Sequence, residues 1–195
     1  MSLVIGYRDY ADGSVWMASD GLATFGCAQV EVVKVRRYDN GSVLVGTTGL
    51  HRLNNIILDL YAPTMGSPHG EHPYDFALRF AQDLRLRCKE AGVLTPNKEG
   101  QEDMGGRVLL GYAGHLFGVS SDFAVIEHSP WWAIGCGCEW AEGALEDWVA
   151  KARADIEPLP GEALQKVVAG TFAVAPAVLA RAQEISRRIA GASKP

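Results

Sequence analysis

Residues 15–26 read Val-Trp-Met-Ala-Ser-Asp-Gly-Leu-Ala-Thr-Phe-Gly, an apolar run followed by an aspartate and a short segment that ends in Thr-x-Gly. A first apolar, β-prone run, Leu3 to Tyr7, precedes it, and Asp12-Gly13 separates the two. An Asp-Gly pair between two such runs predicts a β-hairpin, because glycine tolerates positive φ. Asp20 is therefore predicted at the end of the second strand of a hairpin.

The same pattern follows immediately in the chain. The Val-rich run Gln29 to Arg37 leads to Asn40-Gly41, and Ser42 to Thr47 comes next. We expect a second hairpin, and two consecutive hairpins predict an antiparallel sheet at the N-terminal end.

Helices are predicted after these strands, and the order then repeats. Apolar residues recur at helical spacing from Leu50 to Leu60 and from Tyr74 to Cys88, separated by a Gly/Pro-rich loop over 62–73. After a polar loop over 95–106, four strands are predicted over 107–112, 115–119, 124–127 and 131–134. A helix with Trp140, Ala144 and Trp148 aligned follows, then a helix over 161–168, a strand over 171–174 and a helical tail over 178–189. Separate blocks of strands and helices predict an α+β fold, with two antiparallel sheets packed face to face and helix pairs outside, a four-layer αββα sandwich.

Composition and charge narrow the class of protein. The chain has 195 residues, a length that suits one domain, and 48% of them are hydrophobic. The net charge is −5 and no basic stripe is present, so nucleic-acid binding has little electrostatic support. No signal peptide or membrane-spanning run is evident, and we expect a cytoplasmic protein.

Metal ligands are sparse in the sequence. Cys136-Gly137-Cys138 has no second cysteine pair nearby, so buried free thiols are the simpler interpretation of the four cysteines. His69, His72 and Glu71 share one loop and could hold a metal, but solvated loop side chains explain them equally well. We expect no metal and no cofactor.

Five short motifs, taken in order, resemble those of proteasome β-type and HslV subunits, which are N-terminal-nucleophile hydrolases. The motifs are Ser2–Gly6, residues 15–26, Val33-Lys34-Val35, Val-Leu-Val-Gly-Thr-Thr-Gly over 43–49, and Trp-Ala-Ile-Gly-Cys-Gly over 132–137. The resemblance extends from Ser2 to Trp148, and 18, 14 and 15 residues separate Ser2, Asp20, Lys34 and Gly49 in turn. It implies an αββα domain over 1–176, followed by a C-terminal helical extension over 177–195 whose end frays.

The resemblance also implies the roles of individual residues. Ser2, once Met1 is removed, is the expected nucleophile, with its own α-amine as base. Lys34 is the cation beside it, Asp20 fixes Lys34, and Gly49 offers a backbone N–H to the oxyanion. Thr24 is expected to bind the peptide backbone and Thr47 to help form the pocket for the side chain before the cut. Cys136 stands where the family has a serine that supports the terminal amine.

Each of these residues also has a simpler interpretation. Serine is common after the initiator methionine, Asp20 could serve only a turn, and Lys34 could lie where its strand face reaches solvent. Gly49 could serve only helix entry. Three departures from the family matter: the nucleophile is Ser rather than Thr, Cys136 replaces a serine, and Ala169-Gly170-Thr171 lacks the family's supporting Asp.

The resulting hypothesis is a self-compartmentalising peptidase subunit that cleaves polypeptides inside a homo-oligomeric ring or stacked rings. The resemblance also implies an ATP-dependent unfoldase as a possible partner. It would be a separate protein, because this chain has no nucleotide-binding loop of its own. The alternatives are a catalytically inactive ring subunit and an amidase acting on a small molecule.

Overall fold

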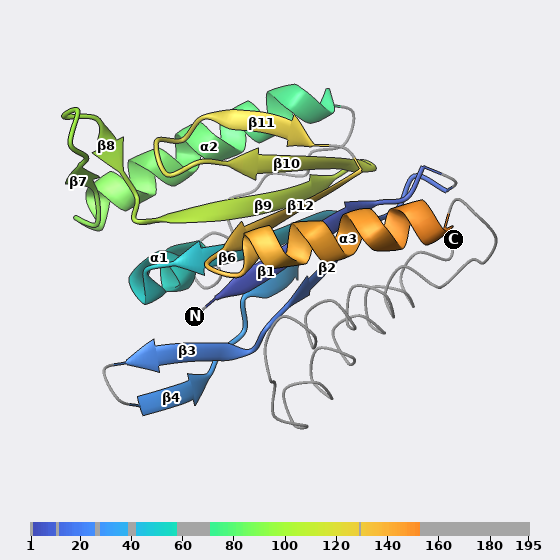
Figure 1. The fold of residues 1–195 in the computed structure, drawn as a ribbon. Helices are drawn as coiled ribbons and strands as arrows, with labels where there is room; N and C mark the ends of the chain where they lie inside the picture. The colour runs from blue at the N-terminus through green and yellow to red at the C-terminus, as the bar shows by residue number, and fades with distance from the viewer. Residues whose placement is uncertain are drawn as a thin grey trace.

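The computed structural model describes residues 2–10, 12–25, 28–38, 42–57, 71–128 and 130–152, and Figure 1 shows their arrangement. The predicted helix over 161–168, strand over 171–174, helical tail over 178–189 and C-terminal extension over 177–195 lie outside these residues, as does most of the predicted loop over 62–73. None of the helices in the described part is long and apolar enough to cross a membrane.

The first strand of the chain lies at the centre of a three-stranded antiparallel sheet. β1 (Leu3–Arg8) pairs on one side with β2 (Val15–Ser19) and on the other with β12 (Trp131–Gly135). The predicted hairpin around Asp12-Gly13 is confirmed as β1–β2. Because β12 lies beside β1, the start of the chain is next to a segment more than a hundred residues away in sequence, with Leu3 opposite Gly135.

A five-stranded antiparallel sheet has the order β11-β10-β9-β6-β5. Its strands are β5 (Val35–Tyr38), β6 (Val43–Gly49), β9 (Gly106–Tyr112), β10 (His115–Val119) and β11 (Val125–His128). Two small hairpins project from the main body, β3 (Leu22–Phe25) with β4 (Ala28–Glu31), and β7 (Thr95–Pro96) with β8 (Glu102–Asp103).

Helices cover the outer faces of both sheets in the described residues (Figure 1). α1 (His51–Asn55) and α2 (Pro73–Glu90) pack on the five-stranded sheet, and α3 (Cys138–Ala152) packs on the three-stranded sheet. The two sheets meet through a third apolar cluster that includes Val4, Met17 and Leu109.

Alternate residues of one strand enter different clusters, which explains why the strands are apolar throughout. Val43 and Val45 face α1 and α2, whereas Leu44 faces the other sheet. Leu3 and Ile5 face α3, whereas Val4 points between the sheets. A strand that is covered on both faces needs apolar residues at every position, because its side chains alternate between them.

Two predictions about the N-terminal strands were wrong. The run Gln29 to Arg37 is not one strand. β4 ends at Glu31, β5 begins at Val35, and residues 32–34 belong to neither strand. The two hairpins also do not form one sheet, since β1–β2 and β5–β6 belong to different sheets. The break at 32–34 is what carries the chain from one part of the molecule to the other.

The apolar stripe predicted for the helix after Gly137 was also wrong. Ala141 and Leu145 are fully buried against the three-stranded sheet, whereas Trp140 is 79% exposed and Ala144 is exposed. The buried face of α3 is therefore offset by one position from the predicted stripe.

Candidate active site

Ser2 directly precedes β1 and is held against the residue that follows β12. Its main-chain nitrogen donates to Cys136 Sγ at 3.0 Å, and the thiol lies 3.5 Å from the Ser2 carbonyl oxygen. Ser2 is half-buried and Cys136 is exposed. A thiol is a weaker hydrogen-bonding group than the serine hydroxyl that the family resemblance leads one to expect here, so it holds this nitrogen less firmly.

Asp20 and Lys34 form a buried ion pair beside Ser2. Lys34 Nζ lies 2.7 Å from Asp20 Oδ2 and 2.9 Å from Oδ1, and it also donates to the Leu22 carbonyl at 2.6 Å. The two residues are only 2% and 5% exposed. All three ammonium protons thus have an acceptor, which is the condition under which a buried lysine is tolerated.

Asp20 also binds the main chain next to Ser2. Its Oδ1 accepts the Leu3 N–H at 2.6 Å, and the Asp20 N–H donates to the Leu3 carbonyl at 3.2 Å. One carboxylate therefore connects the Lys34 ammonium to the residue that follows Ser2. The position of Ser2 relative to Lys34 is set by this connection, because both of its ends are buried hydrogen bonds.

Burial lowers the pKa of Lys34, while the Asp20 carboxylate and the Cys136 side chain oppose that shift. Desolvation disfavours the charged ammonium, and a nearby carboxylate favours it. Lys34 was predicted on a strand face with Val30 and Val32, but it lies in the break between β4 and β5, and Val30 is 39% exposed. Burial of Lys34 comes from the pocket and not from a strand face.

The end of β6 forms another wall of the site. Thr47 is buried, its N–H donates to the Lys34 carbonyl at 2.9 Å, and its hydroxyl donates to Asn54 Oδ1. Asn54 in α1 also donates to the Val33 carbonyl at 3.2 Å. Asn54 thus ties together helix α1, strand β6 and the segment that carries Lys34.

Gly49 ends β6 in a conformation and a space that only glycine fits. Its φ is +111°, and a Cβ atom there would lie 2.3 Å from the Gly105 carbonyl oxygen. The backbone at Gly49 therefore approaches the facing strand more closely than any other residue type allows.

Gly135 packs against Ser2 in the same way. Its φ is +105°, and a Cβ atom there would lie 2.1 Å from the Ser2 carbonyl oxygen. The absence of a side chain at position 135 is thus a requirement for the observed position of Ser2.

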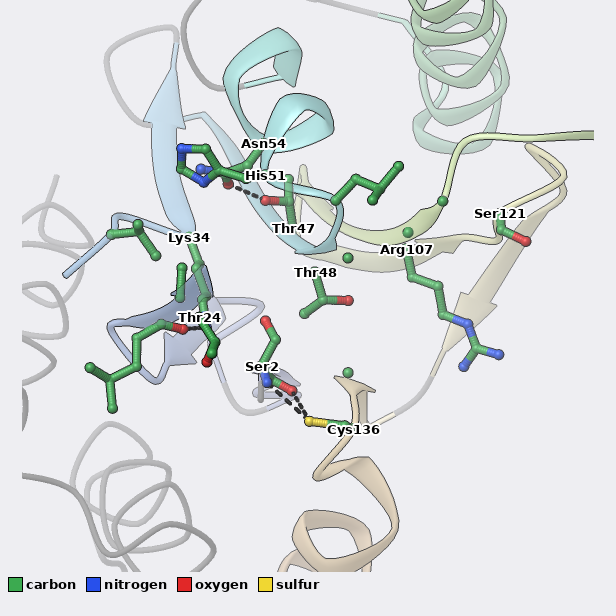
Figure 2. A pocket seen from close by; sticks show the side chains of 18 of the residues that line it. Ser2, Thr24, Lys34, Thr47, Thr48, His51, Asn54, Arg107, Ser121 and Cys136 are labelled. Carbon is green, nitrogen blue, oxygen red and sulfur yellow. Dashed lines mark hydrogen bonds between the residues drawn. The ribbon is translucent and has the colours of Figure 1, made fainter. Parts of the chain in front are cut away.

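A pocket of about 850 Å³ collects these groups (Figure 2). Ser2, Thr24, Lys34, Thr47, Gly49 and Cys136 all line it, so the structure brings six of the seven predicted site residues to one cavity. The seventh, Asp20, lies behind Lys34. Thr24 is on β3 and is exposed, and Figure 2 shows it on the same side of Ser2 as Lys34.

The same architecture occurs in solved structures. Thiobacillus denitrificans BPH in complex with epoxomicin has a TM-score of 0.68 and 23% identity, with 87% of this chain and 91% of that chain covered. Anbu, an ancestral beta-subunit from Yersinia bercovieri, has a TM-score of 0.61 and 17% identity, with coverage of 87% and 72%. HslV from Trypanosoma brucei has a TM-score of 0.52 and 16% identity, with 88% of each chain covered.

The chain has the fold of the proteasome-type N-terminal-nucleophile hydrolases. The resemblance recognised in the sequence is thereby confirmed for this proteasome-type fold. No protein-family model and no curated protein matches the sequence, so at these identities the fold is what the comparisons establish.

Several pocket residues were not identified from the sequence. Asn54, His51 and Arg107 line the pocket, and Gly135 determines how closely β12 approaches Ser2. Asn54 is polar and sits four residues after Leu50, at the start of a predicted apolar stripe, which could have marked it as a residue facing a polar group. Gly135 was quoted only as part of the motif over 132–137, without a role, and nothing local marks Arg107, because the residues around both positions in the pocket are distant in sequence.

Proposed function

We propose that this protein is a peptidase that hydrolyses peptide bonds with Ser2 as its N-terminal nucleophile after Met1 has been removed. The observation that carries the proposal is the buried Asp20–Lys34 pair, whose carboxylate also binds the Leu3 N–H and whose lysine lines the same pocket as Ser2. A buried lysine that lines a pocket and has a perturbed pKa and a specific carboxylate partner is a candidate for a functional site.

The proposed reaction begins with the terminal amine. An α-amine has an unperturbed pKa of about 7.7–8.0, so near neutral pH part of it is free to accept the Ser2 hydroxyl proton. The adjacent Lys34 ammonium favours the deprotonated forms of both groups. Cys136 accepts the main-chain N–H of Ser2, and we infer that it accepts an N–H of the free amine in the same way once Met1 is removed.

Ser2 Oγ then attacks the carbonyl carbon of the scissile bond. The backbone N–H of Gly49 stabilises the oxyanion, and the proton held by the amine passes to the leaving nitrogen as the C–N bond breaks. This leaves an acyl ester on Ser2, which water hydrolyses with the same amine as base. We infer that Thr24 and Thr47, which line the same pocket, bind the acyl part of the substrate, Thr24 by bonding the peptide backbone and Thr47 by helping to form the pocket for the side chain before the cut.

The proposal extends to the assembly. We infer a homo-oligomeric ring or stacked rings in the cytoplasm with the pocket facing an inner chamber, polypeptides as substrates, and a separate ATP-dependent unfoldase as a possible partner. We further propose that the domain extends to residue 176, that the helix expected over 161–168 pairs with α3 in the αββα sandwich, and that residues 177–195 form a helical extension. The fold shared with HslV and Anbu supports this proposal.

The test is peptide hydrolysis by the untagged protein, compared with two variants. Ser2→Ala keeps the free amine and removes the hydroxyl. A form with an uncleavable N-terminal tag keeps the Ser2 side chain and removes the free amine, and so it is the matched control for the base. We expect only the untagged Ser2 protein to cleave.

Three results would count against this function. Cleavage by the tagged form would show that the terminal amine is not the base. An assembled but inactive protein that retains Met1 would favour the alternative of a structural ring subunit. Turnover of a small amide without peptide cleavage would favour the amidase alternative.

A further inference from the structure

The guanidinium of Arg107 projects along the pocket that contains Ser2 (Figure 2). Arg107 is the second residue of β9, it lies opposite Thr48 of β6, and its exposed side chain lines the pocket that contains Ser2. Among the residues that the structure describes, the Arg107 guanidinium makes no ion pair.

The two other charged side chains that line the pocket, Lys34 and Asp103, already have bonding partners among the described residues. Lys34 is neutralised by Asp20. The carboxylate of Asp103 accepts the Gly105 N–H at 2.6 Å and the Ser121 hydroxyl at 3.1 Å. Arg107 is therefore the pocket cation that stays available to a bound molecule.

Arg107 lies on the opposite side of Ser2 from the residues proposed to bind the acyl part. β6 runs between β5 and β9, so the Lys34 carbonyl meets Thr47 on one edge of β6 while Arg107 meets Thr48 on the other. Figure 2 shows the same separation, with Thr24 and Lys34 on one side of Ser2 and Arg107 on the other. A peptide substrate whose acyl part lies along Thr24 and Thr47 would therefore extend beyond Ser2 on the side where Arg107 lies.

We propose that Arg107 binds a carboxylate in the leaving-group part of the substrate, and so gives the site a preference for acidic residues or a free C-terminus after the cut. A guanidinium suits this task, because its planar N–H groups match the two oxygens of a carboxylate. The inference rests on the proposed function for its assignment of the two sides, and it adds a specificity that the catalytic residues do not provide.

The experiment measures binding rather than turnover, so that it stands apart from catalysis. Full-length Ser2→Ala protein is titrated into four fluorescein-labelled octapeptides of alanine and leucine. They are identical except that the sixth residue is Glu or Gln and the C-terminus is a free acid or an amide. Fluorescence polarisation gives the dissociation constants for this protein and for the same protein carrying Arg107→Gln, Arg107→Lys or Lys98→Gln.

Lys98→Gln is the matched control. Lys98 is exposed in the β7–β8 loop, lies outside the pocket, and its loss changes the net charge by the same amount. We expect an acidic peptide to bind roughly 5-fold more tightly than its neutral counterpart, as for a partly exposed ion pair. Arg107→Gln should reduce that ratio to about one, while Arg107→Lys retains part of it and Lys98→Gln all of it.

The four peptides separate the two sources of the carboxylate, since the Glu/Gln pair tests a side chain and the acid/amide pair tests a C-terminus. Equal binding of all four peptides, no binding, or a preference that survives Arg107→Gln would overturn the inference. Failure of the Ser2 protein to cleave peptides would instead count against the proposed function, because the binding assay needs no hydrolysis.

Discussion

Replacing Gly135 by alanine should disable the site through a single misplaced carbonyl. A Cβ atom at this position would lie 2.1 Å from the Ser2 carbonyl oxygen, whereas real Cβ atoms essentially never approach below 3.0 Å. The Ser2 backbone must therefore retreat by about 0.9 Å, the difference between those two distances. A misplacement of about 1 Å can cost roughly 100-fold in rate. We expect a loss of that size in kcat/KM for peptide hydrolysis, and in the rate at which an epoxyketone labels Ser2.

Gly92→Ala is the matched control for backbone strain. Gly92 also has a positive φ, +63°, but nothing lies within 4 Å of its added Cβ. An alanine with a positive φ should lower the free energy of unfolding of both variants by about 1–3 kcal/mol, which urea unfolding measures. Only Gly135→Ala should lose activity. If both variants show the same small decrease in kcat/KM, contact with Gly135 does not position Ser2 and the reasoning is refuted.

Two further predictions concern stability. Lys34→Met should destabilise the protein by about 3–5 kcal/mol in urea unfolding, because it leaves the Asp20 carboxylate buried without its partner. Adding Asp20→Asn should restore most of that loss. A Lys34→Met variant as stable as the unaltered protein would contradict this prediction. Burial lowers the pKa of His128 from 6.5 to about 4, so the fold favours its neutral form. The free energy of unfolding should therefore be highest above pH 6.5 and should decrease as the pH falls towards 4, because the unfolded chain then binds a proton that the folded protein does not. His128→Phe, which keeps a ring against Trp132, should therefore unfold with a shallower pH dependence between pH 7 and pH 5, whereas the exposed His72→Gln should keep the original slope.

Local sequence patterns predicted the elements whose causes are local. The Asp12-Gly13 turn identified the β1–β2 hairpin, and the apolar spacing identified α2 with its buried Leu84 and Cys88. These features depend on turn chemistry and on the helical period, which neighbouring residues determine.

The division of the strands into two sheets could not be predicted in this way. Residues 32–34 read Val-Val-Lys and contain no glycine or proline, yet the strand breaks there. The break follows from burial of the Lys34 ammonium against Asp20 and the Leu22 carbonyl, a contact between segments that only the fold brings together. The β3–β4 hairpin was not predicted for the same reason. It forms where the chain lies outside both larger sheets.

The candidate site was predicted by order and spacing of motifs rather than by physical pattern. Ser2, Asp20 and Lys34 were identified because the motifs resemble a family, and the structure brings them together around Leu3. The roles of Gly135 and Arg107 were not identified, because they depend on the close approach of Gly135 to Ser2 and on the absence of an ion pair to Arg107 among the described residues. Neither property can be read from neighbours in sequence.

The most direct test of the central claim is the intact mass of the untagged protein before and after incubation with a peptide epoxyketone, followed by peptide mapping. We expect the mass to lack Met1, and we expect one adduct, on the peptide that begins with Ser2. The tagged form, which has the same hydroxyl but no free amine, should remain unlabelled. Retention of Met1, or an adduct on Cys136 instead of Ser2, would contradict the account.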